Sequence, residues 1–170
     1  MSNIGIKTSA VLVLIAVLAF SRVIPHPSNF TPLLGMAVFA GARLDNKLFA
    51  IIAPLTAMFL SDLVIGLHSG MSIIYFAILV NVLFGFYLKD RFSSLQIGGT
   101  LISGAVLFFL ITNFTVWYGS GFYSKDLAGL ISCYTMGLPF FQNTLISSII
   151  YGFGAFYLFE FLETRYLNKV

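Results

Sequence analysis

The 170-residue sequence contains few charged residues, only five prolines and a single cysteine. Charged side chains make up 9% of it, against roughly 25% in soluble domains. Hydrophobic residues make up 59%, among them 19 Phe and 8 Tyr, and the mean hydropathy is +0.98. So little charge excludes a soluble globule, and so many aromatic residues exclude a disordered chain. The composition therefore predicts an all-α integral membrane protein with a single transmembrane domain over residues 1–170.

The scarcity of cysteine and of charge also excludes several kinds of function. Cys133 has no partner for an internal disulfide or a CxxC metal pair. The net charge of +3 is too small and too scattered for a nucleic-acid surface. The sequence has no HExxH or GxSxG motif, no Gly-rich phosphate loop and no two carboxylates spaced to share a proton. We therefore expect neither an enzyme nor a resident cofactor, and no nucleic-acid partner.

Long apolar runs predict six transmembrane helices, because a helix needs about 20 residues to cross ~30 Å of hydrocarbon. They cover residues 8–24, 30–44, 47–67, 71–88, 97–118 and 143–162. Three prolines within residues 24–32 predict a structured loop there. The more polar segment 119–141 predicts a short interfacial helix before the last span, ended by Gly137 and Pro139.

The basic residues are distributed unequally between the two sides of this six-helix arrangement. With both termini cytoplasmic, two basic residues lie outside, Arg22 and Lys125. Seven lie inside: Lys7, Arg43, Lys47, Lys89, Arg91, Arg165 and Lys169. Because cytoplasmic loops carry an excess of Lys and Arg, this distribution favours cytoplasmic termini and an even number of spans.

An acidic residue, Asp62, lies near the outer end of the third predicted span. A carboxylate at the centre of a membrane helix costs about 2.5 to 3.5 kcal/mol on insertion scales, so it should be paired or functional. Arg22, near the outer end of the first span, is its expected partner. The pair would either join two helices and order the loop or take a direct part in ligand binding.

Other polar residues near the outer side each have a functional and a structural interpretation. His26, between two prolines, could donate a hydrogen bond or bind a metal, or its ring could bond to backbone carbonyls. Asn113 could cap a neighbouring helix or bind solute, whereas Trp117 suits an interface anchor and His68 a turn. Cys133 could be a small buried residue or a thiolate ligand to a metal in the substrate.

Together these residues predict an outward-facing site for a small molecule. The predicted substrate-binding residues are His26, Asn29, Asp62, Asn113, Trp117 and Tyr134. The alternative is a structural or assembly subunit of the membrane, in which the same side chains only hold helices together.

Four segments also carry a resemblance to a known family: RVIPHPSNFTP at 22–32, LSDL at 60–63, TNFTVWY at 112–118 and CYTMGLPFF at 133–141. They resemble a family of small bacterial inner-membrane transport proteins with no assigned substrate. The general plan is similar to that of the S components of energy-coupling-factor vitamin transporters, and the size to that of the solitary BtuM-type cobalamin transporters.

This resemblance implies uptake of a vitamin-like molecule across the bacterial inner membrane. A cobalamin or another corrinoid is the first expectation, with a different vitamin or heterocycle as the alternative. Cys133 or His26 could then bind the metal of the substrate. The resemblance also implies energy-coupling subunits as partners, but the first span lacks the Ala-xxx-Ala pair used to dock them, and the nearest such pair is Ala53 and Ala57.

Overall fold

The computed structural model describes residues 3–88 and 93–166. Its six helices are α1 (Asn3–Ser21), α2 (Leu33–Arg43), α3 (Lys47–Ile65), α4 (Met71–Leu88), α5 (Ser94–Gly119) and α6 (Leu127–Arg165). No strand occurs in these two ranges, so the predicted all-α class is confirmed.

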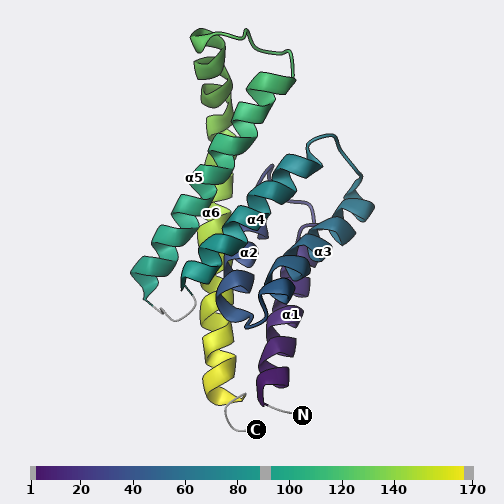
Figure 1. The fold of residues 1–170 in the computed structure, drawn as a ribbon, viewed down its shortest axis with the longest axis vertical. Coiled ribbons are helices and arrows are strands. Elements are labelled where there is room, and N and C mark those ends of the chain that lie inside the picture. Colours follow the sequence, from purple (N-terminus) through teal and green to yellow (C-terminus); the bar gives the residue numbers. More distant parts are fainter. Residues whose placement is uncertain (1–2, 89–92, 167–170) are drawn as a thin grey trace.

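Successive helices run in alternating directions, so the start of α1 and the end of α6 lie at the same end of the molecule (Figure 1). An ion pair joins them there, with 2.7 Å between Lys7 Nζ and Glu163 Oε1. Arg43, at the end of α2, lies over the rings of Phe156 and Phe159 near the same end of α6. Of the basic residues expected on this side, Lys89, Arg91 and Lys169 lie outside the described residues.

Four helices, α3 to α6, are long and apolar enough to cross a membrane. The predicted bounds of α4 agree with the structure, and those of α3 differ by two residues. The apolar stretch Gly5–Ser21 of α1 and the whole of α2 are shorter. With 11 residues, α2 rises only about 16 Å, roughly half of the hydrocarbon thickness. The predicted span 30–44 is therefore a half-length helix that begins inside the bundle.

The short helix α2 is the centre of the bundle. Ten of its eleven residues are buried, because neighbouring helices cover it on every side. A Cβ atom at Gly41 would lie 2.2 Å from the carbonyl oxygen of Val82 on α4, and one at Gly85 would lie 2.2 Å from that of Val38. Real Cβ atoms do not approach so closely, so α2 and α4 pack backbone against backbone at these glycines.

The predicted interfacial helix before the last span is wrong, because α6 continues without a break through Gly137 and Pro139. Proline removes one backbone hydrogen bond, but membrane helices tolerate it where neighbouring helices support the chain. Here Phe109 of α5 packs against rings on both sides of Pro139, with centroid distances of 5.4 Å to Tyr134 and 4.8 Å to Phe141. The two halves of α6 are thus held in line as one helix of 39 residues, about 58 Å long.

Gly85→Ala tests the close contact of α2 with α4. We expect this single methyl group to lower the free energy of unfolding by about 1 to 3 kcal/mol, as overpacking does in well-packed interiors. The measurement is the midpoint of thermal unfolding in detergent. Gly99→Ala on α5 is the matched control, because nothing lies within 4 Å of its added Cβ. Equal midpoints for the two variants would contradict the proposed packing.

Candidate functional site

A buried ion pair joins Arg22, the residue after the end of α1, to Asp62 in the last turn of α3. Arg22 Nη1 donates to Asp62 Oδ1 and, over 2.7 Å, to Ser61 Oγ. Tyr75 on α4 donates its hydroxyl to the other carboxylate oxygen, Oδ2, over 2.8 Å. The predicted ion pair is confirmed, and it joins the end of α1 to α3 while Tyr75 joins α3 to α4.

The Asp62 side chain has no exposed surface, and that of Arg22 is 11% exposed. Removing two charges from water costs several kcal/mol per ion unless each charge meets a partner and further hydrogen bonds. Both carboxylate oxygens have a donor here, which is what allows the charge to be buried. The two opposite charges therefore neutralise each other, and the pair as a whole carries no net charge.

A small cavity of about 90 Å³, lined by both polar and apolar side chains, lies beside this pair at the point where α2 begins. Its polar lining comes from Arg22, Asn29, Thr31 and Thr144, and apolar side chains close the remainder. The residue before α2 is Pro32, and no side chain caps the helix. Because the first amides of an α-helix have no acceptor within the helix, the start of α2 carries partial positive charge toward this region.

The loop 22–32 covers the cavity and is fixed by contacts with α6. Asn143 on α6 donates to the carbonyl oxygen of Ser28 over 2.9 Å. The ring of Phe30 packs edge-on against Tyr151 at a centroid distance of 6.0 Å. The prediction of a structured loop is therefore correct.

Two residues of this loop were predicted to bind substrate. The ring nitrogens of His26 lie 3.1 Å from the carbonyl oxygens of Pro27 and Arg22, as in the structural interpretation of this histidine. Asn29 lines the cavity and has a φ of 62°, a left-handed conformation that asparagine adopts more readily than most residues. His26 therefore shapes the loop, whereas Asn29 contributes to the cavity wall.

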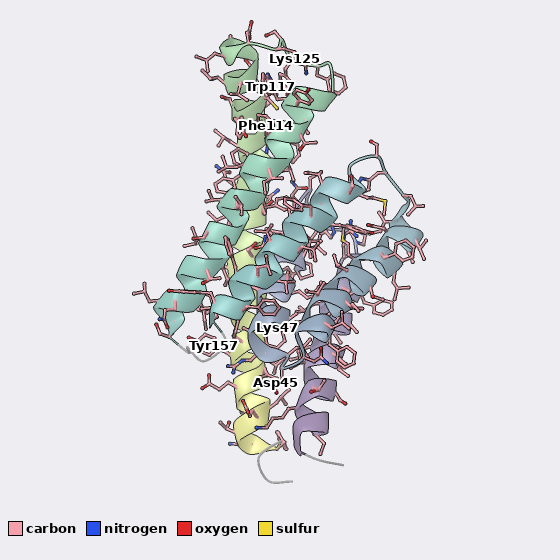
Figure 2. The ribbon with its side chains drawn as sticks, viewed as in Figure 1. Asp45, Lys47, Phe114, Trp117, Lys125 and Tyr157 are labelled. Atoms are coloured by element: carbon pink, nitrogen blue, oxygen red, sulfur yellow. The ribbon has the colours of Figure 1, made fainter. Side chains whose placement is uncertain are left out.

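None of the other four predicted binding residues lines this cavity. Asp62 lies on α3, and the remaining three lie on the hairpin of α5 and α6. Tyr134 donates its hydroxyl to the carbonyl oxygen of Leu110 over 2.7 Å, and Trp117 Nε1 donates to that of Ser124 over 2.9 Å. Figure 2 shows Trp117 and Lys125 together at the end of this hairpin, where Lys125 lies over the indole ring. These contacts stabilise the hairpin, and they do not bring Trp117 or Tyr134 to the cavity.

Asn113 belongs to the packing of α5 against α6. Its Nδ2 donates to the carbonyl oxygen of Phe109 over 2.9 Å, and its Oδ1 lies against Gly137, where an added Cβ would be 2.4 Å away.

Cys133 is 2% exposed, and its thiol donates to the carbonyl oxygen of Asn113 over 3.4 Å. The structure therefore favours the small buried interpretation of Cys133. Within the described residues, no three His, Cys, Asp or Glu side chains gather as a metal site.

The loop that joins α5 to α6 contains one carboxylate with a shifted pKa. The amide of Gly129 and the hydroxyl of Ser124 both donate to Asp126 Oδ1 over 2.7 Å. These bonds lower the pKa of Asp126 below its ordinary value, the Gly129 amide having the larger effect. Because the ionised carboxylate accepts these bonds more strongly than the neutral acid, it stabilises the start of α6 at pH values above its unfolded pKa. This stabilisation is lost as the pH falls through the lowered pKa of the folded state.

Sequence reasoning missed Thr31, Tyr75 and Thr144. A buried carboxylate has two oxygens to satisfy, so Asp62 implied a second donor besides Arg22, although not which residue would supply it. The two threonines carried no signal, because threonine is common in membrane helices and loops. Thr31 reaches the cavity from the loop before α2, and Thr144 reaches it from α6.

Six packed helices, four of them long and apolar enough to cross a membrane, define this chain as a helical membrane protein. It belongs to DUF6580, a family described as being of unknown function, whose model matches residues 2–169. No curated protein and no solved structure matches the chain.

Asp62→Asn tests the buried pair. It leaves the Arg22 charge without its counter-ion, so we expect the free energy of unfolding to fall by about 3 to 5 kcal/mol. The control is Glu163→Gln in the partly exposed pair with Lys7, for which we expect a loss below about 1 kcal/mol. Thermal unfolding in detergent measures both, and equal losses in the two variants would contradict the role given to Asp62.

Proposed function

We propose that this protein is a membrane transport protein that captures a small polar solute in the cavity at the start of α2. One observation carries the proposal: polar side chains and the start of a half-length helix with no side-chain cap meet at one cavity between the helices. Half-length helices that end at a binding site inside the membrane are a recurring arrangement in transporters. The loop 22–32 covers the cavity and is the element that would move to admit the solute.

The chemistry of the cavity favours a solute with hydrogen-bond acceptors. The start of α2 provides partial positive charge, Asn29 an amide and Thr31 a hydroxyl group. The hydroxyl of Thr144 already donates to the carbonyl oxygen of Phe140, so it offers the solute an acceptor. The Arg22 charge is balanced by Asp62, so a neutral or singly negative solute meets no net repulsion. A carboxylate or a similar acceptor group on a small molecule suits this lining best.

The size of the cavity limits the solute in the closed state. Pockets for drug-sized ligands measure about 300 to 1,000 Å³, several times the 90 Å³ found here. A vitamin or a corrinoid would enter only if the loop 22–32 moved aside. Binding of a corrinoid therefore stays a prediction, and it requires this movement of the loop. Cys133 does not line the cavity, which leaves it remote from any metal in a solute bound there.

We infer that the loop 22–32 faces outward and that the start of α1 and the end of α6 face the cytoplasm of a bacterial cell. Among the described residues, Lys7 and Arg165 lie at the ends of α1 and α6, and Arg43 lies near Glu160 and Glu163. This gathering of basic residues at one end supports the orientation through the positive-inside rule. The same inference takes α1 as one further crossing, and the loop 22–32 together with the half-length helix α2 as another, which gives six.

The energy source of this transport remains part of the proposal. The sequence contains no nucleotide-binding motif, so uptake would use a gradient, facilitated diffusion or a separate energy-coupling subunit. The contacts of Asn113, Trp117 and Tyr134 support the alternative, a structural subunit, for the α5 and α6 hairpin alone. A structural subunit would bind no ligand in the cavity, whereas a transport protein would. Ligand binding therefore distinguishes the two hypotheses.

The double variant Asn29→Gly and Thr31→Val tests the cavity with little change to the backbone. Glycine adopts the left-handed conformation of residue 29, and valine has the shape of threonine, so the variant removes hydrogen bonds and keeps the loop. Small molecules that co-purify with the wild-type protein are identified by mass spectrometry, then added back together with acetate, phosphate and cyanocobalamin in a thermal unfolding assay. We expect one of these compounds to raise the unfolding midpoint of the wild-type protein and not that of the variant.

Thr115→Val is the matched control, because its hydroxyl only donates to a carbonyl of its own helix, that of Ile111. At a concentration 100 times the Kd, a ligand stabilises a protein by about 2.7 kcal/mol, which the assay resolves easily. No stabilisation by any compound, or equal stabilisation of the double variant, would favour the structural subunit. A shift by cyanocobalamin that the double variant loses would establish the corrinoid prediction.

A further inference from the structure

The guanidinium group of Arg22 binds the protein through its Nη1 nitrogen. The two N–H groups of Nη1 donate to Ser61 Oγ and to Asp62 Oδ1. Within residues 3–88 and 93–166, Nε and Nη2 donate to no protein atom, and neither nitrogen is fully buried. Three of the five N–H donors of this cation therefore remain available, and Arg22 lines the cavity at the start of α2.

The remaining donors of Arg22 have the geometry that recognises a carboxylate. In the planar guanidinium, the N–H of Nε and one N–H of Nη2 point in the same direction and match the two oxygens of a carboxylate. The Nη1 contacts with Ser61 and Asp62 fix the plane of the group, and Tyr75 in turn holds Asp62 from α4. Because the donors are already positioned, binding orders little further structure.

We propose that Arg22 selects the solute, by binding the carboxylate of a small monocarboxylate through Nε and Nη2. This inference rests on the proposed function, since it requires the cavity to be a solute site. It gives Arg22 two roles on two edges of one group. One edge pairs with the protein's own carboxylate, and the other binds that of the solute.

The lining of the cavity suits a molecule with one polar end and a short apolar body. Three of the polar residues, Arg22, Asn29 and Thr31, belong to the loop 22–32. The apolar side chains come from the four helices α2 to α5, and they are Leu33, Leu34, Met58, Ile74 and Phe108. A carboxylate bound at the loop therefore leaves the hydrocarbon part of the solute against the helices. The volume of about 90 Å³ keeps that part short while the loop covers the cavity.

The charges around the cavity favour one carboxylate over two. Arg22 and Asp62 cancel each other, so a bound monocarboxylate adds a single negative charge. The start of an α-helix carries roughly half a positive charge, and the start of α2 offsets part of that addition. A second carboxylate on the solute would lie among the apolar side chains, where an ionised group without a partner is costly to bury. We therefore expect the site to reject dicarboxylates.

Thermal unfolding of the full-length protein in detergent, with propionate, propionamide and malonate as probes, tests this role of Arg22. We expect propionate to raise the unfolding midpoint, and neutral propionamide and the dicarboxylate malonate to bind at least about tenfold more weakly. Arg22→Lys keeps a positive charge beside Asp62 but has no parallel pair of donors, so its affinity for propionate should fall about 10- to 100-fold. Arg165→Lys is the matched control, because Arg165 is exposed at the end of α6 and does not line the cavity.

Equal stabilisation by propionate and propionamide, or an unchanged affinity of Arg22→Lys for propionate, would overturn the role of Arg22. A co-purified solute without a carboxylate, whose effect the double variant of residues 29 and 31 removes, would also overturn it, although the proposed function would stand. If no compound stabilises the wild-type protein, the proposed function fails as well. If Arg22→Lys does not fold, the comparison of propionate with propionamide and malonate on the wild-type protein decides the question.

Discussion

The structure depends on one steric constraint, the close approach of α2 to its neighbours. Glycines at 41 and 85 let α2 and α4 touch backbone to backbone, and Gly35 does the same against Gly152 on α6, where an added Cβ would lie 2.7 Å from the amide nitrogen. Between lipid-like surfaces there is little hydrophobic gain from association, so such close van der Waals packing is what holds membrane helices together. The bundle is therefore organised around a helix that is almost completely buried.

This central position explains the site. Because α2 has only 11 residues, it begins inside the bundle, and the chain must return from the end of α1 through the loop 22–32 to reach it. That route brings Arg22 to Asp62 and leaves the polar start of α2 beside a cavity. The cavity and the buried pair are thus two consequences of the same short helix.

The sequence predicted what local pattern and charge determine. Apolar runs located α3 and α4 closely, and the cost of a buried carboxylate predicted the pairing of Asp62 with Arg22. It did not predict that α6 runs through Pro139, because the support comes from the ring of Phe109 on α5, which is distant in sequence. For the same reason Asn113 was grouped with the cavity residues, although it packs against Gly137. Outer-side location alone does not say which polar residues share a site.

The central claim is that the cavity under loop 22–32 receives solute from outside the cell. The most direct measurement is the labelling of Thr31→Cys, with Cys133→Ser to remove the only native thiol, by a membrane-impermeant maleimide in right-side-out vesicles. The account predicts labelling from the outer side that slows when the co-purifying solute is present. Labelling that occurs only after the vesicles are opened, or whose rate is the same with and without the solute, would contradict it.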